Sequence, residues 1–253
     1  MSTVLIKAHL DLFRGEQFKP TMIMLSSCVL IALWRTIGTQ CFYHQYLAEF
    51  VQKSALFNGY QDAATHYHVT FAAYYHICMC FLLLGIVPAL IIKLVFREKL
   101  SDYGVTPGRV KLGMLLLVLA LPALVLIDLL SAEDLAIRSE YPINRNAGDS
   151  PAAFAVHALV LGLFYIGWEM HFRGFLQHGL AGSMGKNNAV LVQVMASCLA
   201  HIGKPTNELL ASIPAGVFWG LQAFRTKSLL AGFLQHWLLG VMLDYFICWQ
   251  WAA

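Results

Sequence analysis

Residues 154–174 read FAVHALVLGLFYIGWEMHFRG, so an apolar run from Phe154 to Ile166 is followed closely by a carboxylate, an imidazole and a guanidinium. Ionisable groups beside hydrocarbon are costly, at about 2.5–3.5 kcal/mol for an Asp, Lys or Arg near the centre of a membrane helix. A membrane helix that keeps such groups therefore indicates a functional site. On a helix, Glu169 and Arg173 are four residues apart and share a face. The structural alternative is an ion pair that only joins two helices.

The composition is that of an integral membrane protein. Of 253 residues, 58% are hydrophobic and 12% are charged, whereas soluble domains average about 25% charged residues. The net charge of +3 is small and spread over loops, which excludes a nucleic-acid footprint. Six cysteines are scattered without a CxxC pair, so no zinc or redox motif is present in the sequence.

Hydropathy predicts an all-α, polytopic membrane bundle of about seven transmembrane helices, each needing about 20 residues to cross the hydrocarbon. The expected spans are Thr21–Gly38, Val69–Phe96, Val110–Leu130, Pro151–Arg173, Asn188–His201, Leu209–Phe224 and Ser228–Trp249. Two regions differ in character. Residues 1–150 form an N-terminal membrane region of three apolar helices and loops, whereas residues 151–253 carry almost all of the intramembrane polar chemistry.

The distribution of Lys and Arg predicts the orientation in the membrane. These residues gather in the N-terminal segment, in residues 93–111 and in the loop at 225–227. Loops rich in Lys and Arg stay on the cytoplasmic side. We therefore expect a cytoplasmic N-terminus and a C-terminus on the outer side.

Three expected helices offer reactive groups. The first ends in Glu169 and Arg173, the second closes at His201, and the third carries Gln235 and His236. A carboxylate with two imidazoles can activate a water and stabilise an oxyanion. Glu169, His201 and His236 are also part of a possible zinc site, because two His and one carboxylate can hold Zn²⁺. A third interpretation is an interhelical hydrogen-bond network with no catalytic role.

The order of these residues resembles a known family. Glu169 opens a Glu-x-x-x-Arg-Gly motif, His201 closes a helix, and the letters RTKS at 225–228 lead to the Gln-His pair ending at His236. Together these motifs resemble the CPBP group of intramembrane proteases, which includes the type II CAAX prenyl endopeptidases and bacteriocin-processing and immunity proteins. The resemblance covers about Ala153–Tyr245.

The resemblance implies an endopeptidase whose site lies within the bilayer and which cleaves a protein tail or a membrane-anchored peptide, lipidated or not. It places water activation on Glu169, orientation of that carboxylate on Arg173, and assistance on His201 and His236. It implies no cofactor. The alternatives are a zinc-dependent variant, and a non-catalytic membrane scaffold or immunity-type protein with the same fold.

The sequence departs from the family pattern at three positions. Trp168 replaces the first of two consecutive glutamates, the one to which the family's water activation is usually assigned. Ser197 replaces a phenylalanine, and Gly240 replaces an asparagine that contributes to the oxyanion region, so that function is vacant or supplied elsewhere. Outside the motifs, Glu208 is interpreted as a carboxylate in the first turn of a helix or as a second-shell partner of His201.

Overall fold

The computed structural model describes residues 15–53 and 64–250, and every regular element in these ranges is helical. The predicted all-α fold is confirmed. The elements that position the site are α2 (Phe18–Thr36), α5 (Ala64–Cys80), η4 (Phe81–Ile86), α6 (Val87–Leu90), η5 (Ile91–Phe96), α7 (Val110–Ser131), α8 (Leu135–Glu140), α9 (Pro151–Glu169), η8 (Met170–His178), α10 (Gly179–Met184), α11 (Lys186–Ala200), α12 (Thr206–Thr226), α13 (Leu230–Tyr245) and η9 (Phe246–Gln250). The short elements are η1 (Gly15–Gln17), α3 (Gln40–Phe42), η2 (Tyr43–Leu47), α4 (Ala48–Gln52), η6 (Leu100–Tyr103) and η7 (Ala147–Asp149).

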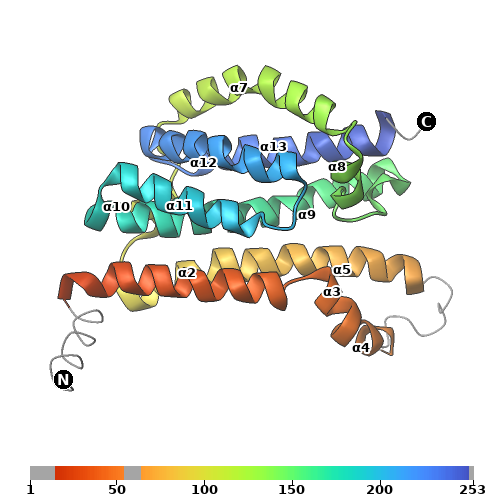
Figure 1. The fold of residues 1–253 in the computed structure, drawn as a ribbon, viewed down its shortest axis with the longest axis horizontal. Helices are drawn as coiled ribbons and strands as arrows, with labels where there is room; N and C mark the ends of the chain where they lie inside the picture. Colours follow the sequence, from red (N-terminus) through yellow and green to blue (C-terminus); the bar gives the residue numbers. More distant parts are fainter. Residues whose placement is uncertain (1–14, 54–63, 251–253) are drawn as a thin grey trace.

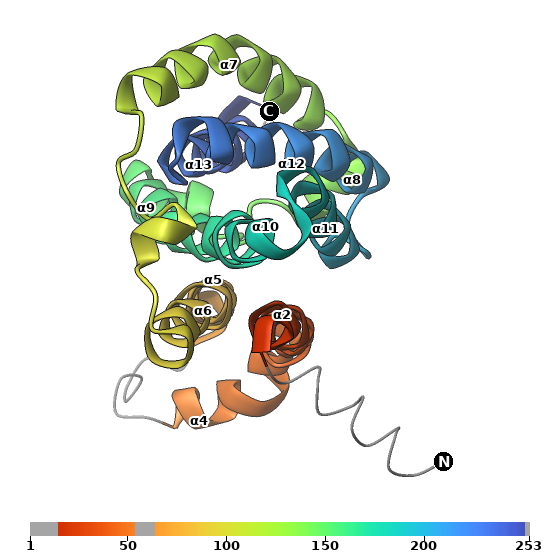
Figure 2. The ribbon, with the colours of Figure 1, turned by 90° about the vertical axis from the view of Figure 1, so that its left-hand side faces the viewer.

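The helices run roughly along one common direction and stack in layers (Figures 1 and 2). The first layer is made of α2 and α5, with α6 continuing α5. The second contains α9, α10 and α11, and the third contains α12 and α13 with α7 arched over them. The α9–η8 helix packs against α5 and η4 on one side and against α13 on the other, so it lies at the centre of the bundle.

This central helix is continuous from Pro151 to Met184. It begins where the Ser150 hydroxyl accepts the Ala153 amide at 3.1 Å, with Pro151 at the first helical position, a favourable helix start. Its middle part, η8, is a π-helical stretch, a feature that is frequent at functional sites. Residues 167–177 are all buried, and the chemistry-bearing motif therefore lies inside the core.

Among the residues that the structure describes, five helices are long and apolar enough to cross a membrane: Gly15–Thr36, His66–Phe96, Val110–Ser131, Pro151–Met184 and Leu230–Trp249. The expected count of seven is not confirmed. The two expected spans that do not meet the length and hydropathy requirements are α11 and α12. The 15 residues of α11 span about 22 Å, shorter than the hydrocarbon core. The longer α12 carries polar residues such as Asn207, Glu208 and Gln222.

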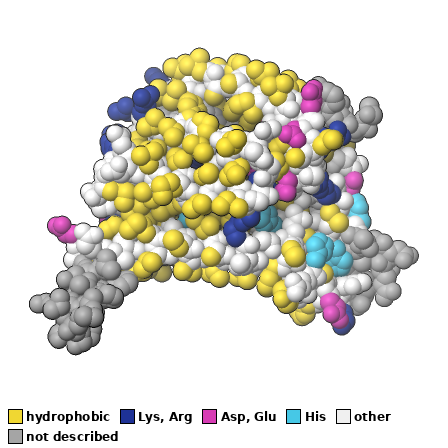
Figure 3. All heavy atoms as spheres, viewed as in Figure 1, with side chains coloured by type: hydrophobic (Ala, Val, Ile, Leu, Met, Phe, Trp, Pro, Cys, Tyr) yellow, Lys and Arg dark blue, Asp and Glu magenta, His cyan; other side chains and the backbone are white. Residues whose placement is uncertain are grey.

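The outer surface suits a lipid environment. Large apolar side chains on α7, α9 and α11 point outward, for example Leu119 at 67%, Leu159 at 71% and Met195 at 63% exposure. Figure 3 shows this apolar surface across the middle of one face, with Lys and Arg at the upper left and several acidic side chains toward the right. Charges at the ends and hydrocarbon between them are what an integral membrane protein requires.

Candidate active site

A cavity of about 690 Å³ lies among α2, α8, α9, α11, α12 and α13, a volume within the range of ligand-binding pockets. Side chains able to take part in chemistry line it from several helices. They include Arg173, His201, Glu208 and His236, with the aromatic rings of Tyr141, Tyr165, Trp168 and Trp219, and also His76, Asp128 and Glu140. The cavity therefore joins two of the three predicted motifs directly, and the first motif reaches it through Arg173 and Trp168.

The predicted pairing of Glu169 with Arg173 is present. The guanidinium Nη1 lies 3.1 Å from Glu169 Oε1, and both side chains are only 2% exposed. The same oxygen accepts a hydrogen bond of 2.9 Å from Nδ1–H of His236 on α13. This bond fixes the imidazole tautomer and leaves Nε2 as the acceptor nitrogen. Glu169 itself does not line the cavity, so it lies behind His236.

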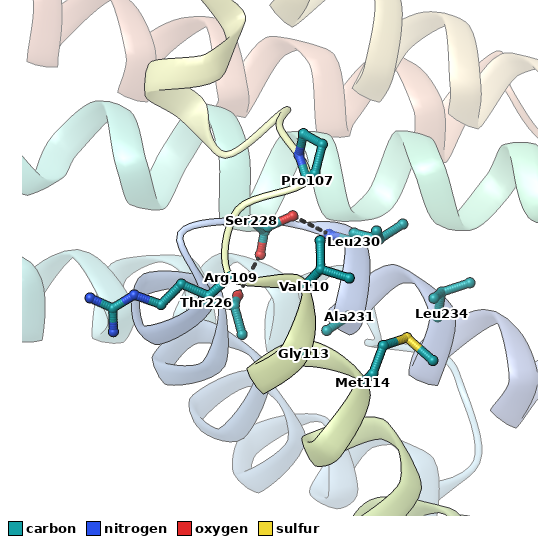
Figure 4. A pocket seen from close by; sticks show the side chains of 10 residues that line it. All are labelled: Pro107, Arg109, Val110, Gly113, Met114, Thr226, Ser228, Leu230, Ala231 and Leu234. Atoms are coloured by element: carbon teal, nitrogen blue, oxygen red, sulfur yellow. Dashed lines mark hydrogen bonds between the residues drawn. The ribbon is translucent and has the colours of Figure 1, made fainter.

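The turn between α12 and α13 sets where α13 begins. Thr226 Oγ1 donates to the Ser228 carbonyl at 3.0 Å, and Ser228 Oγ accepts the Leu230 amide at 3.1 Å (Figure 4). The Ser228 hydroxyl also donates to the Thr106 carbonyl, and the Arg109 amide donates to the Thr226 carbonyl at 2.7 Å. The loop before α7 is thereby attached to this turn, and only a small void of about 20 Å³ remains between them. Within residues 225–228, Thr226 and Ser228 thus fix the start of α13.

The next polar contacts fix the face that α13 presents to α12. Gln235 Oε1 accepts from Trp219 Nε1 at 2.9 Å and from Gln222 Nε2 at 3.1 Å, and all three side chains are buried. The Trp219 ring stacks on the His236 ring with centroids 4.2 Å apart. The Tyr165 ring lies 4.5 Å from the same imidazole. His236 is therefore held by one carboxylate and two aromatic rings.

His201 approaches the cavity from the end of α11. Its Nδ1–H donates to the Ser197 carbonyl at 2.7 Å, which leaves Nε2 facing Glu208 Oε1 at 4.0 Å. Burial lowers the pKa of His201 below its ordinary value of 6.5, although the bond to Ser197 and the Glu208 charge act in the opposite direction. The imidazole is therefore neutral at pH 7, with a free lone pair on Nε2. The Tyr141 hydroxyl donates to Glu208 Oε1 at 2.7 Å.

Trp168 lies between the two histidines. Its ring centroid is 5.2 Å from that of His201 and 6.4 Å from that of His236, with near-perpendicular planes in both cases. At the position where the family pattern has its first glutamate, this chain therefore places an indole in contact with both imidazoles.

The neighbourhood of Gly240 shows what fills the space of the family's asparagine. A Cβ at Gly240 would lie 2.1 Å from the Tyr165 hydroxyl oxygen, a distance that no real contact allows. The Tyr165 hydroxyl thus occupies the place that a larger residue at position 240 would need. Because Tyr165 also lines the cavity, a hydroxyl group stands near the region from which the asparagine is missing.

The comparisons with known proteins bear on this geometry. Residues 147–242 match the family model for Type II CAAX prenyl endopeptidase Rce1-like proteins. The resemblance to the intramembrane protease family is confirmed over this segment. The matched segment covers less than half of the chain and contains α9, η8, α10, α11, α12 and most of α13. Most of these elements line the cavity, together with α2 and α8 outside the segment. No curated protein and no solved structure gives a significant match.

The geometry gives no support to the zinc alternative. Glu169 and His236 are bonded directly to each other, and within residues 15–53 and 64–250 no three His, Cys, Asp or Glu side chains are grouped as metal ligands. Two His and one carboxylate would have to converge on one point to hold Zn²⁺. The absence of a cofactor stays a prediction that only a metal measurement can test.

Several lining residues were not predicted from the sequence. Tyr141, Tyr165 and Trp219 each contact the predicted histidines or Glu208 across long sequence separations, and no local pattern marks them. The sequence predicts Glu208 as a carboxylate in the first turn of a helix or as a side chain that supports His201, not as a group that lines the cavity. The sequence does contain one signal for Glu208. It comes seven residues after His201, at the end of the loop that follows this histidine, and so must lie near it.

Proposed function

We propose that the protein is an intramembrane endopeptidase that hydrolyses a peptide bond in a membrane-anchored protein tail. The observation that carries the proposal is the placement of two imidazoles from separate helices on one cavity, inside a bundle with a lipid-facing surface. The match to a prenyl endopeptidase family over the same elements supports this reaction class. The cavity volume is sufficient for a short extended peptide.

In this proposal Glu169 and Arg173 position His236. The carboxylate accepts a hydrogen bond from Nδ1–H of the imidazole, and the guanidinium lies 3.1 Å from the same oxygen. A fixed imidazole with Nε2 available can exchange a proton at the reacting centre, as in other carboxylate–histidine pairs. Glu169 was predicted as the direct base on the water. Because it lies behind His236, its direct contact with a water in the cavity is not supported, and its effect is expected to pass through His236.

The substrate class follows from the membrane setting. A peptide reaches the cavity from the bilayer between helices, so its anchor is a lipid or a transmembrane segment. The family match favours a prenylated carboxyl-terminal tail. An unprenylated anchored peptide of bacterial type is the second substrate class that the resemblance allows.

The test uses the full chain purified and reconstituted into proteoliposomes with two fluorogenic probes. One probe is a farnesylated CAAX-type peptide, and the other is an unprenylated peptide on a transmembrane anchor. We expect the wild-type chain to cleave at least one of them. Glu169→Gln should abolish cleavage, and circular dichroism should show that the helices are retained. Full activity in that variant would refute the role given to Glu169.

Metal removal separates the metal-free scheme from the zinc alternative. We expect that dialysis against EDTA and 1,10-phenanthroline leaves the cleavage rate unchanged and that elemental analysis finds less than one zinc per chain. Inactivation by chelator with recovery on adding Zn²⁺ would instead establish the metal mechanism.

A non-catalytic scaffold or immunity-type protein is the rival function, and the presence of Trp168 in place of a glutamate favours it. A scaffold would use the Glu169–His236 contact only for stability. If the protein is a scaffold, we expect that the wild-type chain cleaves neither probe and that replacing His236 causes a large loss of thermal stability.

A further inference from the structure

We propose that Glu208, in the first turn of α12, is the carboxylate that activates the hydrolytic water, with His201 as its partner. This inference rests on the proposed peptidase function and assigns a catalytic role that the family motifs do not contain. It places the water between His201 at the end of α11 and Glu208 on α12, next to the Trp168 ring.

Glu169, the carboxylate of the first motif, is not placed to act on a water in the cavity. Glu169 Oε1 already accepts from His236 and pairs with Arg173, and its side chain is 2% exposed. It has no place in the cavity lining. A general base must come within hydrogen-bond reach of the proton that it takes. The base for a water in this cavity therefore has to be a different group.

Glu208 supplies a carboxylate oxygen at the cavity. It lines the cavity, and its Oε1 is held by the Tyr141 hydroxyl at 2.7 Å. Its Oε2 is buried without a hydrogen-bond partner in the described part of the chain. Oε1 accepts from Tyr141 with one lone pair and keeps a second, so it can also accept a hydrogen bond from a water in the cavity.

The gap between Glu208 Oε1 and His201 Nε2 has the width that a bridging water needs. His201 donates a hydrogen bond from Nδ1–H to the Ser197 carbonyl, so its Nε2 is an acceptor. This Nε2 lies 4.0 Å from Glu208 Oε1. Two acceptors do not bond each other. A water that donates at about 2.8 Å to each of two acceptors spans roughly 4.4 Å between them. The observed gap is close to this span, and a water held so turns its lone pairs toward a third atom.

The chemistry then balances without a cofactor. Glu208 takes one proton from the water as the water oxygen bonds to the scissile carbonyl carbon. The carbon–nitrogen bond breaks, and the proton on Glu208 passes to the leaving nitrogen. The products are a carboxylic acid and an amine, and no group is oxidised or reduced. His201 keeps the water oriented through Nε2, and the Arg173 charge faces the same cavity, where negative charge develops on the carbonyl oxygen.

The experiment compares two carboxylates, of which one lines the cavity and the other does not. Glu208→Gln keeps the size and the acceptor for Tyr141 but removes the base. Glu98→Gln is the matched control, because Glu98 also accepts a hydrogen bond from a tyrosine hydroxyl, that of Tyr103, and pairs with Lys19, but lies outside the cavity lining. We expect Glu208→Gln to lower kcat by roughly 10²–10⁴-fold with KM within about twofold. Glu98→Gln should keep kcat within about twofold of wild type.

Chemical rescue separates a catalytic role from a structural one. Glu208→Ala leaves space for a small carboxylate, so sodium formate should restore part of its activity. Formate should not help Glu208→Gln, in which the amide fills the space. Both variants should unfold within a few degrees of wild type.

Each outcome decides a question. If the wild type cleaves a probe and Glu208→Gln retains more than a tenth of its kcat, the role of Glu208 is wrong and the peptidase function stands. If Glu208→Ala is inactive and formate restores nothing, Glu208 has only a structural role. If the wild type cleaves neither probe, the peptidase function is wrong, and the role of Glu208 is wrong with it.

Discussion

At the scale of single residues, the Glu169–Arg173 pair shows how a membrane core tolerates charge. Both side chains are 2% exposed and lie 3.1 Å apart, so each charge is compensated by the other inside the core. Removing one partner of such a pair costs about 3–5 kcal/mol, because it leaves the other charge buried and alone. Replacing both by apolar groups of similar volume is often neutral.

This leads to a stability prediction. Glu169→Gln should lower the unfolding free energy by about 3–5 kcal/mol, and the double variant Glu169→Gln/Arg173→Met should regain most of that loss. Thermal unfolding in detergent, followed by circular dichroism, measures both. The double variant should remain inactive, because His236 still lacks its carboxylate. A double variant no more stable than the single one would contradict the interpretation of a compensated pair.

A second prediction concerns pH and His201. Burial lowers the pKa of this imidazole below 6.5, while Glu208 acts to raise it and Lys204 and Arg173 act to lower it further. Protonation of Nε2 removes the acceptor that holds the water. We therefore expect kcat/KM to be constant between about pH 6.5 and pH 8 and to fall as the pH drops below the ordinary histidine value. An acid limb centred above pH 6.5 would show that this imidazole is not the group that titrates.

At the scale of elements, the approach of α9 to η4 depends on Gly167. A Cβ at Gly167 would lie 2.8 Å from the Cys80 carbonyl oxygen and 2.9 Å from Phe81 Cα, both backbone atoms that cannot move aside. Gly167→Ala should lower the unfolding free energy by about 1–3 kcal/mol through overpacking. Gly182→Ala on α10 is the control, since nothing lies within 4 Å of its added Cβ. It should be neutral or stabilising by up to about 1 kcal/mol. Equal melting temperatures for the two variants would refute the close-packing argument.

The predictability of the elements differs along the chain. Hydropathy predicted the helices of 69–96, 110–130 and 151–173 because long apolar runs fix both their existence and their burial. The four-residue spacing also predicted the Glu169–Arg173 pair, which holds although η8 is π-helical. The contacts of Glu208 with His201 and Tyr141 were beyond such reasoning. They depend on how the loop after α11 turns α12 back toward α8, and no periodicity encodes a contact across 67 residues.

At the scale of the whole molecule, the division at residue 150 stays a prediction. Part of the packing crosses it, because α7 lies on α13 and α5 lies on α9. The family match begins at residue 147, just before α9. The elements that carry the reactive groups therefore lie between α2 and α5 on one side and α7 on the other (Figure 2).

The orientation in the membrane is a further prediction at this scale. In Figure 1, α2 begins at the left end of the bundle and η9 ends near the right end, which agrees with an odd number of crossings. We expect the N-terminus on the cytoplasmic side and the C-terminus outside, from the Lys and Arg distribution. In a bacterial host, alkaline phosphatase fused after Ala253 should be active, and the same enzyme fused within 99–109 should not. The reverse pattern would invert the predicted topology.

Trp168 and Trp219 give the cavity an optical property of its own. Two of the histidines that line the cavity have an indole beside them, with ring centroids 5.2 Å apart for Trp168 and His201 and 4.2 Å apart for Trp219 and His236. Indole emission is quenched by a nearby imidazolium and is sensitive to water leaving its surroundings. Intrinsic fluorescence, resolved with Trp168→Phe and Trp219→Phe, should therefore signal occupancy at either imidazole separately, with no added dye.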